Sequence, residues 1–128
     1  MTEEEVIQTL QEYFESLFPK ACPSCNRYFI TLREYILNTK RIGVTISYDA
    51  ELGNWDTKQP IGSLAAANCP CGSTLALSTR DMELSLRLEL LGWVRVETQE
   101  RQVSPSELLE HLRDEVRKRA LGDQIADG

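Results

Sequence analysis

The sequence Cys22-Pro23-Ser24-Cys25 and its counterpart Cys69-Pro70-Cys71-Gly72 are the features of this 128-residue chain on which its fold depends. In each, a short spacer brings two sulfurs together at a tight turn, and the proline after the first cysteine stiffens that turn. Two such turns that face each other supply four thiolates to a tetrahedral metal ion. We therefore predict that Cys22, Cys25, Cys69 and Cys71 bind one metal ion together.

Zinc is the metal that we expect, as one structural Zn²⁺, because a closed site of four thiolates stabilises a fold without redox chemistry. The alternatives are a thiol or zinc redox switch, an iron–sulfur or rubredoxin-like iron site, and four unliganded thiols. The N-terminal sequence MTEEEVIQTLQ has neither the basic start nor the apolar stretch of a secretory signal. We therefore expect a cytoplasmic, reducing location, where metal binding is more common than disulfides. No apolar run approaches the roughly 18 residues of a membrane span, so no membrane partner is expected.

Short strands are predicted around both cysteine pairs. Residues 28–30 form a strand candidate after the first pair, and the alternating stretch 42–48 predicts a longer strand. Residues 49–62 carry turn residues and predict a loop, in which we expect Trp55 to lie as a lid over the core rather than as an exposed contact. Residues 63–77 predict a hairpin whose tip holds the second pair. The alternation of the longer strand places three side chains on one side: Val44, Ile46 and Tyr48.

Helices are predicted before, between and after these strands. The first lies within residues 1–19 and begins with a capping box of Thr2 and Glu5. Thr31 and Glu34 predict a second, shorter helix in the same way. Both predictions depend on local side-chain hydrogen bonds, which the sequence itself specifies.

Two further helices are predicted at the C-terminal end. The stretch 80–101 alternates as a strand would, but residues 80–93 lack β-branched residues and are rich in helix formers, so we predict a helix capped by Ser78 or Thr79. Its leucines point to several sides, which predicts that it is buried or paired with another chain. The helix 105–121 begins with a capping sequence at Ser104 and ends at Gly122.

The two cysteine pairs resemble those of the zinc-ribbon class, and the resemblance covers roughly residues 20–77. The second pair departs from the usual pattern because it lacks one spacer residue. The resemblance implies a small antiparallel β unit built around a structural zinc ion. The residues that carry it are Cys22, Pro23 and Cys25 in one knuckle, and Cys69, Pro70, Cys71 and Gly72 in the other.

The predicted fold class is α+β: a small antiparallel, zinc-ribbon-like β centre with an N-terminal helix and a C-terminal helical hairpin. We expect a single domain over residues 1–128, since hydrophobic residues (41%) and charged residues (27%) are near globular averages. Its predicted parts are the N-terminal helix (1–19), the four-cysteine β region (20–78), the helical hairpin (79–122) and a loose tail (123–128).

Sequence motifs of known catalytic classes are absent, including the Walker loop, G-x-G-x-x-G, G-x-S-x-G and H-E-x-x-H. The only histidine, His111, lies beside Glu110 in the charged last helix, so we expect it to be solvated or packed rather than a metal ligand. Catalytic zinc sites keep an open position and often include histidine. We therefore expect that the chain is not an enzyme.

Three functions remain as hypotheses. The leading one is a small zinc-binding, regulatory module that contacts another protein, or a second copy of itself as a possible dimer, through its helices. The second is a redox sensor, and the redox-regulated chaperone family also uses a C-x-C and a C-x-x-C pair, though in the opposite order and closer together. The third, a nucleic-acid-binding ribbon, is disfavoured by the net charge of −6. Its support comes from a slightly basic middle with four residues: Arg27, Tyr28, Phe29 and Arg33.

Overall fold

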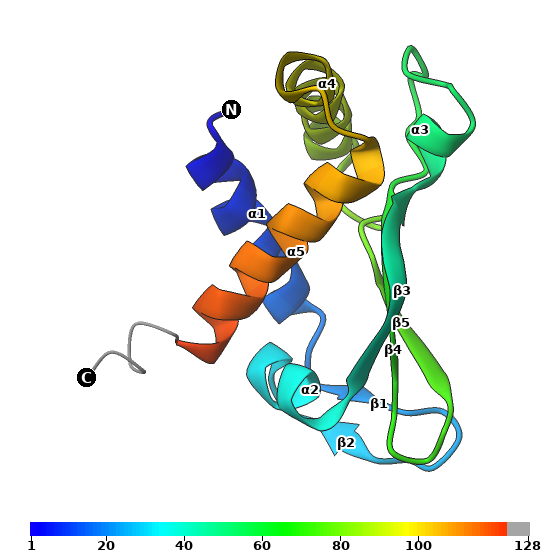
Figure 1. Ribbon diagram of the computed structural model, residues 1–128. Coiled ribbons are helices and arrows are strands. Elements are labelled where there is room, and N and C mark those ends of the chain that lie inside the picture. The colour runs from blue at the N-terminus through cyan, green and yellow to red at the C-terminus, as the bar shows by residue number, and fades with distance from the viewer. Residues whose placement is uncertain (123–128) are drawn as a thin grey trace.

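The computed structural model describes residues 1–122, so the predicted loose tail 123–128 lies outside the described residues. It contains two separate antiparallel sheets rather than one continuous β centre. The larger has the order β3-β4-β5, and the smaller pairs β1 with β2 (Figure 1). The strand bounds are β1 Lys20–Ala21, β2 Tyr28–Phe29, β3 Lys40–Ser47, β4 Ser63–Asn68 and β5 Thr74–Ser78.

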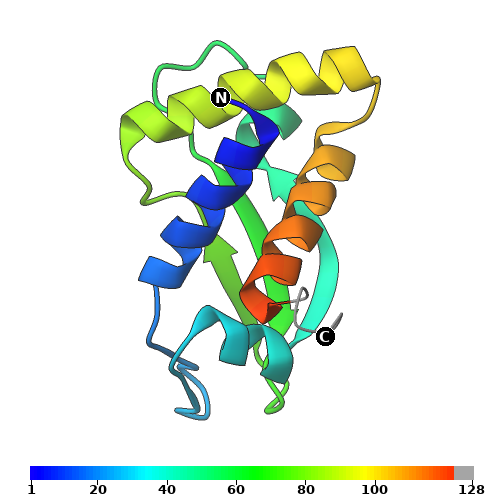
Figure 2. The same ribbon diagram turned by 90° about the vertical axis from the view of Figure 1, so that its left-hand side faces the viewer.

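Helices α1, α2, α4 and α5 form a layer on one face of the larger sheet, and α3 lies at the end of β3 (Figure 1). Helix α5 packs on β3, and α1, α2 and α4 pack on α5. Figure 2 shows α1 and α5 side by side with α4 crossing near their upper ends. The predicted α+β class is therefore confirmed. The helix bounds are α1 Glu3–Ser16, α2 Leu32–Asn38, α3 Tyr48–Glu51, α4 Leu84–Arg101 and α5 Pro105–Leu121.

Three helices begin at the predicted side-chain caps. The hydroxyl of Thr2 accepts from the Glu5 backbone N–H at 3.1 Å, and the Glu5 carboxylate accepts from the Thr2 N–H at 2.8 Å. Ser104 caps α5 in the same reciprocal way, and Thr31 caps α2. Gly122 ends α5 in the left-handed conformation that the sequence predicts there.

Strand β3 differs from its prediction in where it ends and which side chains it buries. Its pairing with β4 shifts register between Ile42 and Ile46, next to Gly43 at φ +62°. Such a bulge adds a residue and changes which side chains face the core. Thr45 and Ser47 are buried toward the helices, whereas Val44 is 59% exposed. Tyr48 lies outside the strand, because the Ser47 hydroxyl caps α3 by accepting from the Ala50 N–H at 3.2 Å. The stretch 49–62 that was predicted as a loop therefore begins within a short helix.

Helix α4 also begins later than predicted. Neither Ser78 nor Thr79 caps it; its N-cap is Glu83, which makes no side-chain capping bond. Thr79 is used by the hairpin instead, since its hydroxyl accepts from the Ser63 N–H at 2.9 Å. The helix buries one face rather than several, and three of its apolar side chains remain exposed: Leu84, Leu88 and Val96.

The hydrophobic core lies between the larger sheet and the helical layer. Trp55 is half-buried and packs against this core, as predicted for a lid. None of the helices within residues 1–122 is long and apolar enough to cross a membrane.

Candidate metal centre

The first cysteine pair lies in the turn of the small hairpin. Strands β1 and β2 pair Ala21 with Tyr28, and the Cys22 N–H donates to the Arg27 carbonyl at 2.9 Å. The turn closes when the Asn26 N–H donates to the Cys22 carbonyl at 2.9 Å. Asn26 has φ +64°, a left-handed conformation that asparagine tolerates better than most residues.

The second pair lies in the turn between β4 and β5, as predicted. The Cys69 N–H donates to the Ser73 carbonyl at 2.8 Å, and the Gly72 N–H donates to the Cys69 carbonyl at 2.8 Å. Gly72 has φ +95°, which side chains with a Cβ rarely adopt. Glycine therefore allows this turn to close although its spacer is one residue shorter.

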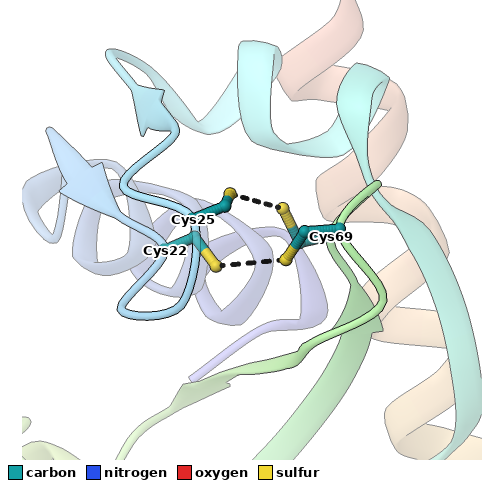
Figure 3. A group of neighbouring side chains, drawn as sticks. Cys22, Cys25 and Cys69 are labelled. Atoms are coloured by element: carbon teal, nitrogen blue, oxygen red, sulfur yellow. Dashed lines mark hydrogen bonds between the residues drawn. The ribbon is translucent and has the colours of Figure 1, made fainter.

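The two turns face each other and bring all four sulfurs together (Figure 3). The sulfur–sulfur distance is 3.7 Å for Cys22–Cys71 and 3.7 Å for Cys25–Cys69, and all four sulfurs lie within 4.8 Å of one another. A regular tetrahedron with metal–sulfur bonds of ~2.3 Å has sulfur–sulfur edges of about 3.8 Å. The spacing fits four ligands of one metal ion, and it exceeds the ~2.05 Å of a disulfide bond.

Each turn contributes one buried and one exposed cysteine. Cys22 is 0% exposed and Cys69 is 2% exposed, whereas Cys25 and Cys71 are exposed. Phe29, on the strand β2 that follows the first pair, is fully buried and belongs to the same core cluster as Cys22 and Cys69. The cluster thus lies at the edge of the core, with two of its sulfurs on residues open to solvent.

Backbone N–H groups in the turns favour the charged form of two sulfurs. Hydrogen bonds from the backbone of Cys25 and Ser24 lower the pKa of the Cys22 thiol. The side chain and backbone of Ser73 lower the pKa of Cys71 to about 6. Thiolates are the form that binds metal ions, so this arrangement suits metal binding.

The pKa of the Cys69 thiol is shifted in the opposite direction. A hydrogen bond from the Cys71 backbone lowers its pKa, but burial and the neighbouring thiols together raise it to about 11. Three sulfurs lie close to Cys69, and a further negative charge among them is unfavourable unless a cation is shared. A metal ion supplies that cation.

No other His, Cys, Asp or Glu side chain within residues 1–122 joins the cysteines as a candidate ligand. Within residues 1–122, the four cysteines are the one group of at least three His, Cys, Asp or Glu side chains placed to hold an ion. His111 lies on α5, where its Nε2 is 3.1 Å from a carboxylate oxygen of Glu3 on α1. The prediction that His111 is not a metal ligand is consistent with this placement.

Of the four residues that suggested nucleic-acid binding, one is buried and three are exposed. Phe29 is buried in the core, and Arg27 donates to the Asn38 side chain at 3.0 Å. Arg33 donates to the Leu121 carbonyl. Both arginines remain exposed, as does Tyr28, whose exposed fraction is 55%.

The sequence analysis did not single out Ser73, whose hydroxyl and N–H both act on the Cys71 sulfur. The signal available in the sequence is a hydroxyl residue two positions after the last cysteine.

Comparisons of the chain with protein-family models, with curated proteins and with solved structures find no significant match.

Proposed function

We propose that this chain is a small zinc-binding protein in which Cys22, Cys25, Cys69 and Cys71 hold one structural Zn²⁺. The observation that carries the proposal is the sulfur spacing of 3.7 Å across the two turns, which is close to the edge of a zinc–thiolate tetrahedron. Four protein ligands leave no open coordination position, so the ion joins the two turns rather than activating a substrate. The proposal accordingly assigns the chain no catalytic activity.

Elemental analysis of the purified protein tests the metal and its stoichiometry. We expect one zinc ion per chain, and we expect Cys69→Ser to lose it. Ser24→Ala is the matched control, because Ser24 lies in the first turn without supplying a sulfur. Stoichiometric zinc in Cys69→Ser would contradict a single four-cysteine site, and stoichiometric iron would replace zinc with a rubredoxin-like centre.

A thiol redox switch is a second candidate, favoured by the exposure of Cys25 and Cys71. Each lies 3.7 Å from a sulfur of the opposite turn. Hydrogen peroxide could oxidise such a pair of thiolates to a disulfide, with two protons consumed and two waters formed, and Zn²⁺ would leave the site.

Peroxide titration separates the two roles. A switch releases zinc at low peroxide, forms a Cys22–Cys71 or Cys25–Cys69 disulfide in peptide mapping, and rebinds zinc after reduction. A purely structural site keeps its zinc until the protein as a whole is damaged.

We further propose that the zinc-stabilised fold acts through protein contact, with a second copy of this chain as the partner of α4. Leu84, Leu88 and Val96 are exposed on α4 at intervals of four or eight residues, with Gly92 between them. A ridge of residues four apart is a common packing surface between helices, and glycine allows close approach. A Cβ added at Gly92 would meet nothing within 4 Å inside the chain. The same ridge on both copies suits a two-fold interface.

Light scattering over a concentration series tests this contact. We expect a mass of twice 14.6 kDa for the wild type at high concentration and 14.6 kDa for Leu88→Glu. Leu52→Glu, on an exposed leucine outside α4, is the control and should keep the dimer mass. A wild-type mass of 14.6 kDa throughout the series would contradict the proposed dimer.

A further inference from the structure

The space between the larger sheet and the helical layer is not completely filled. A cavity of about 150 Å³ lies there, bounded by the inner face of the sheet and by α1, α2, α4 and α5. Its floor includes Ala65 and Ala67, because β4 has the sequence Ser63-Leu64-Ala65-Ala66-Ala67-Asn68. Methyl side chains are too short to reach the helices, and α5 packs on β3 rather than over β4 and β5. The cavity is therefore a consequence of the alanine-rich strand.

Most of the cavity wall is apolar. A cavity of this size holds a molecule about as large as benzene, which corresponds to roughly six to ten non-hydrogen atoms. The apolar wall comes from both layers of the fold. It includes Val6, Leu10, Leu77, Leu90, Leu109 and Val116.

Among the polar groups of the cavity wall, two buried atoms lack a hydrogen-bond partner in the described part of the chain. The Tyr35 hydroxyl and the Arg113 Nη1 are both buried and have no hydrogen-bond partner within residues 1–122. Tyr35 is 4% exposed, and its ring is held between Phe18 and Phe29, with ring centres 5.4 Å away on each side. Buried donors are nearly always paired in folded proteins, so two donors without a protein partner at one cavity are available to an acceptor from outside the chain.

Arg113 is held so that one nitrogen remains available. Its Nη2 donates to the Ala66 carbonyl at 2.9 Å, whereas its Nη1 is 3.7 Å from the Glu110 carboxylate, beyond hydrogen-bond distance. Burial is the main cause that lowers the pKa of Arg113. Burial raises the pKa of Tyr35 to about 12, although the charge of Arg113 acts to lower it. Tyr35 therefore keeps its proton at neutral pH and can donate it.

The charges around the cavity favour an anion over a cation. Four of its lining side chains are arginines and one is an aspartate, Asp49. The Asp49 carboxylate already accepts from the Ile61 and Gly62 N–H groups at 2.9 Å each. It is therefore not an open acceptor for a bound cation. Among the arginines, Arg41 is paired with Asp114 at 2.8 Å, Arg87 donates to the Met82 carbonyl at 2.7 Å and Arg117 is exposed. Arg113 is therefore the arginine that offers a buried donor without a partner.

We propose that this cavity binds a small apolar carboxylate, whose oxygens accept from Tyr35 Oη and Arg113 Nη1 while its hydrocarbon part fills the space above Ala65 and Ala67. The site is separate from the four cysteines and does not require that the metal be zinc. It is tested on the full chain with its metal in place, so that loss of fold at the cysteine end does not affect the result.

Calorimetric titration with hexanoate, hexan-1-ol and hexylamine tests the chemistry of the ligand. We expect hexanoate to bind at least roughly tenfold more tightly than hexan-1-ol, because a charged acceptor gains more from the two donors, and hexylamine to bind most weakly. Equal binding of hexanoate and hexan-1-ol would overturn the assignment of the two donors. No hexanoate binding at millimolar concentration would overturn the site itself.

Matched variants test the residues. Tyr35→Phe and Arg113→Gln should each weaken hexanoate roughly tenfold and leave hexan-1-ol unchanged. The controls are Tyr28→Phe, on an exposed tyrosine, and Arg80→Gln, on an exposed arginine outside the cavity. Unchanged hexanoate affinity in both Tyr35→Phe and Arg113→Gln would overturn the proposal.

Filling the cavity gives a second, independent readout. Ala65→Leu should abolish binding of all three probes and raise the melting temperature, because the added side chain occupies the empty space. Ala76→Leu, on an exposed alanine of the adjacent strand, should change neither. Undiminished hexanoate binding in a folded Ala65→Leu variant would place the ligand elsewhere and contradict the proposal.

Discussion

The cysteine end and the helical layer of this protein are held together by different forces. At the cysteine end, β1 and β2 have two residues each, and the buried side chains there are few. In the helical layer, α1, α4 and α5 each bury at least three residues. A hairpin that small is not stable in water by itself. With the proposed metal ion in place, the cysteine end would depend on ligand bonds, whereas the helical layer depends on apolar burial.

The largest effect is expected from removal of the metal. A structural zinc site contributes on the order of 10 kcal/mol of binding free energy, so a chelator should lower the protection of residues 20–29 and 68–74 against amide exchange, while the turns still close for part of the time. The amides of α1 and α5 should remain protected, because their packing does not include the sulfurs. Loss of protection in all regions at one chelator concentration would show that the two regions unfold as a unit, and would contradict their separate stabilisation.

A core substitution should act on the helical layer alone. Leu108→Ala removes a side chain that is 2% exposed, and should lower the free energy of unfolding by about 2–5 kcal/mol in denaturant titration. Zinc affinity in the folded protein should stay as in the wild type. Leu52→Ala, on an exposed leucine outside α4, is the control and should stay within roughly 0.5 kcal/mol. A matching loss of zinc affinity in Leu108→Ala would show that the stabilities of the two regions are coupled.

A smaller effect is expected within the second cysteine turn. Gly72→Ala places a Cβ on a residue with φ +95° and should cost about 1–3 kcal/mol, together with weaker zinc binding in a competition titration. Asn26→Gly, at φ +64° in the first turn, is the comparison and should be nearly neutral, because glycine adopts that conformation freely. Equal zinc affinities for Gly72→Ala and the wild type would show that the shorter spacer does not depend on glycine.

The mildest change is pH, which separates Cys69 from Cys71 in the metal-free protein. Because its folded pKa is lowered to about 6, Cys71 contributes stability at a pH above the ordinary thiol pKa of 9.0, and this stability is lost as the pH falls toward 6. Cys69 has a folded pKa raised to about 11, so its contribution is present below pH 9.0 and is lost as the pH rises toward 11. The melting temperature should therefore fall on both sides of about pH 9.

Alkylation with iodoacetamide assigns the two limbs of this pH profile. Cys71 should react with a midpoint near pH 6, and Cys69 should stay unreactive until strongly alkaline pH. Cys71→Ser should remove the acid limb and Cys69→Ser the alkaline one. A Cys71 midpoint near that of a free thiol would contradict the role given to Ser73.

Local sequence signals predicted much of this molecule. The capping boxes at Thr2 and Ser104 specify helix starts through bonds between residues three apart, and both are present. The spacing within each cysteine pair predicted that its two sulfurs lie together, because a tight turn brings neighbouring sulfurs together whatever surrounds it. The α+β class followed from the same local patterns. These features depend on a few adjacent residues, so the sequence alone determined them.

Other features were decided by contacts between distant segments. Thr79 could have capped α4, but its hydroxyl bonds to Ser63 across the hairpin, and the helix starts later. The bulge in β3 turned Thr45 toward the helices, which no alternation pattern predicts. Which cysteine of each pair is buried, and the meeting of Tyr35 with Arg113 at the cavity, depend on how α5 and α2 pack. The tertiary structure alone decided these, because burial and pairing depend on residues far apart in the chain.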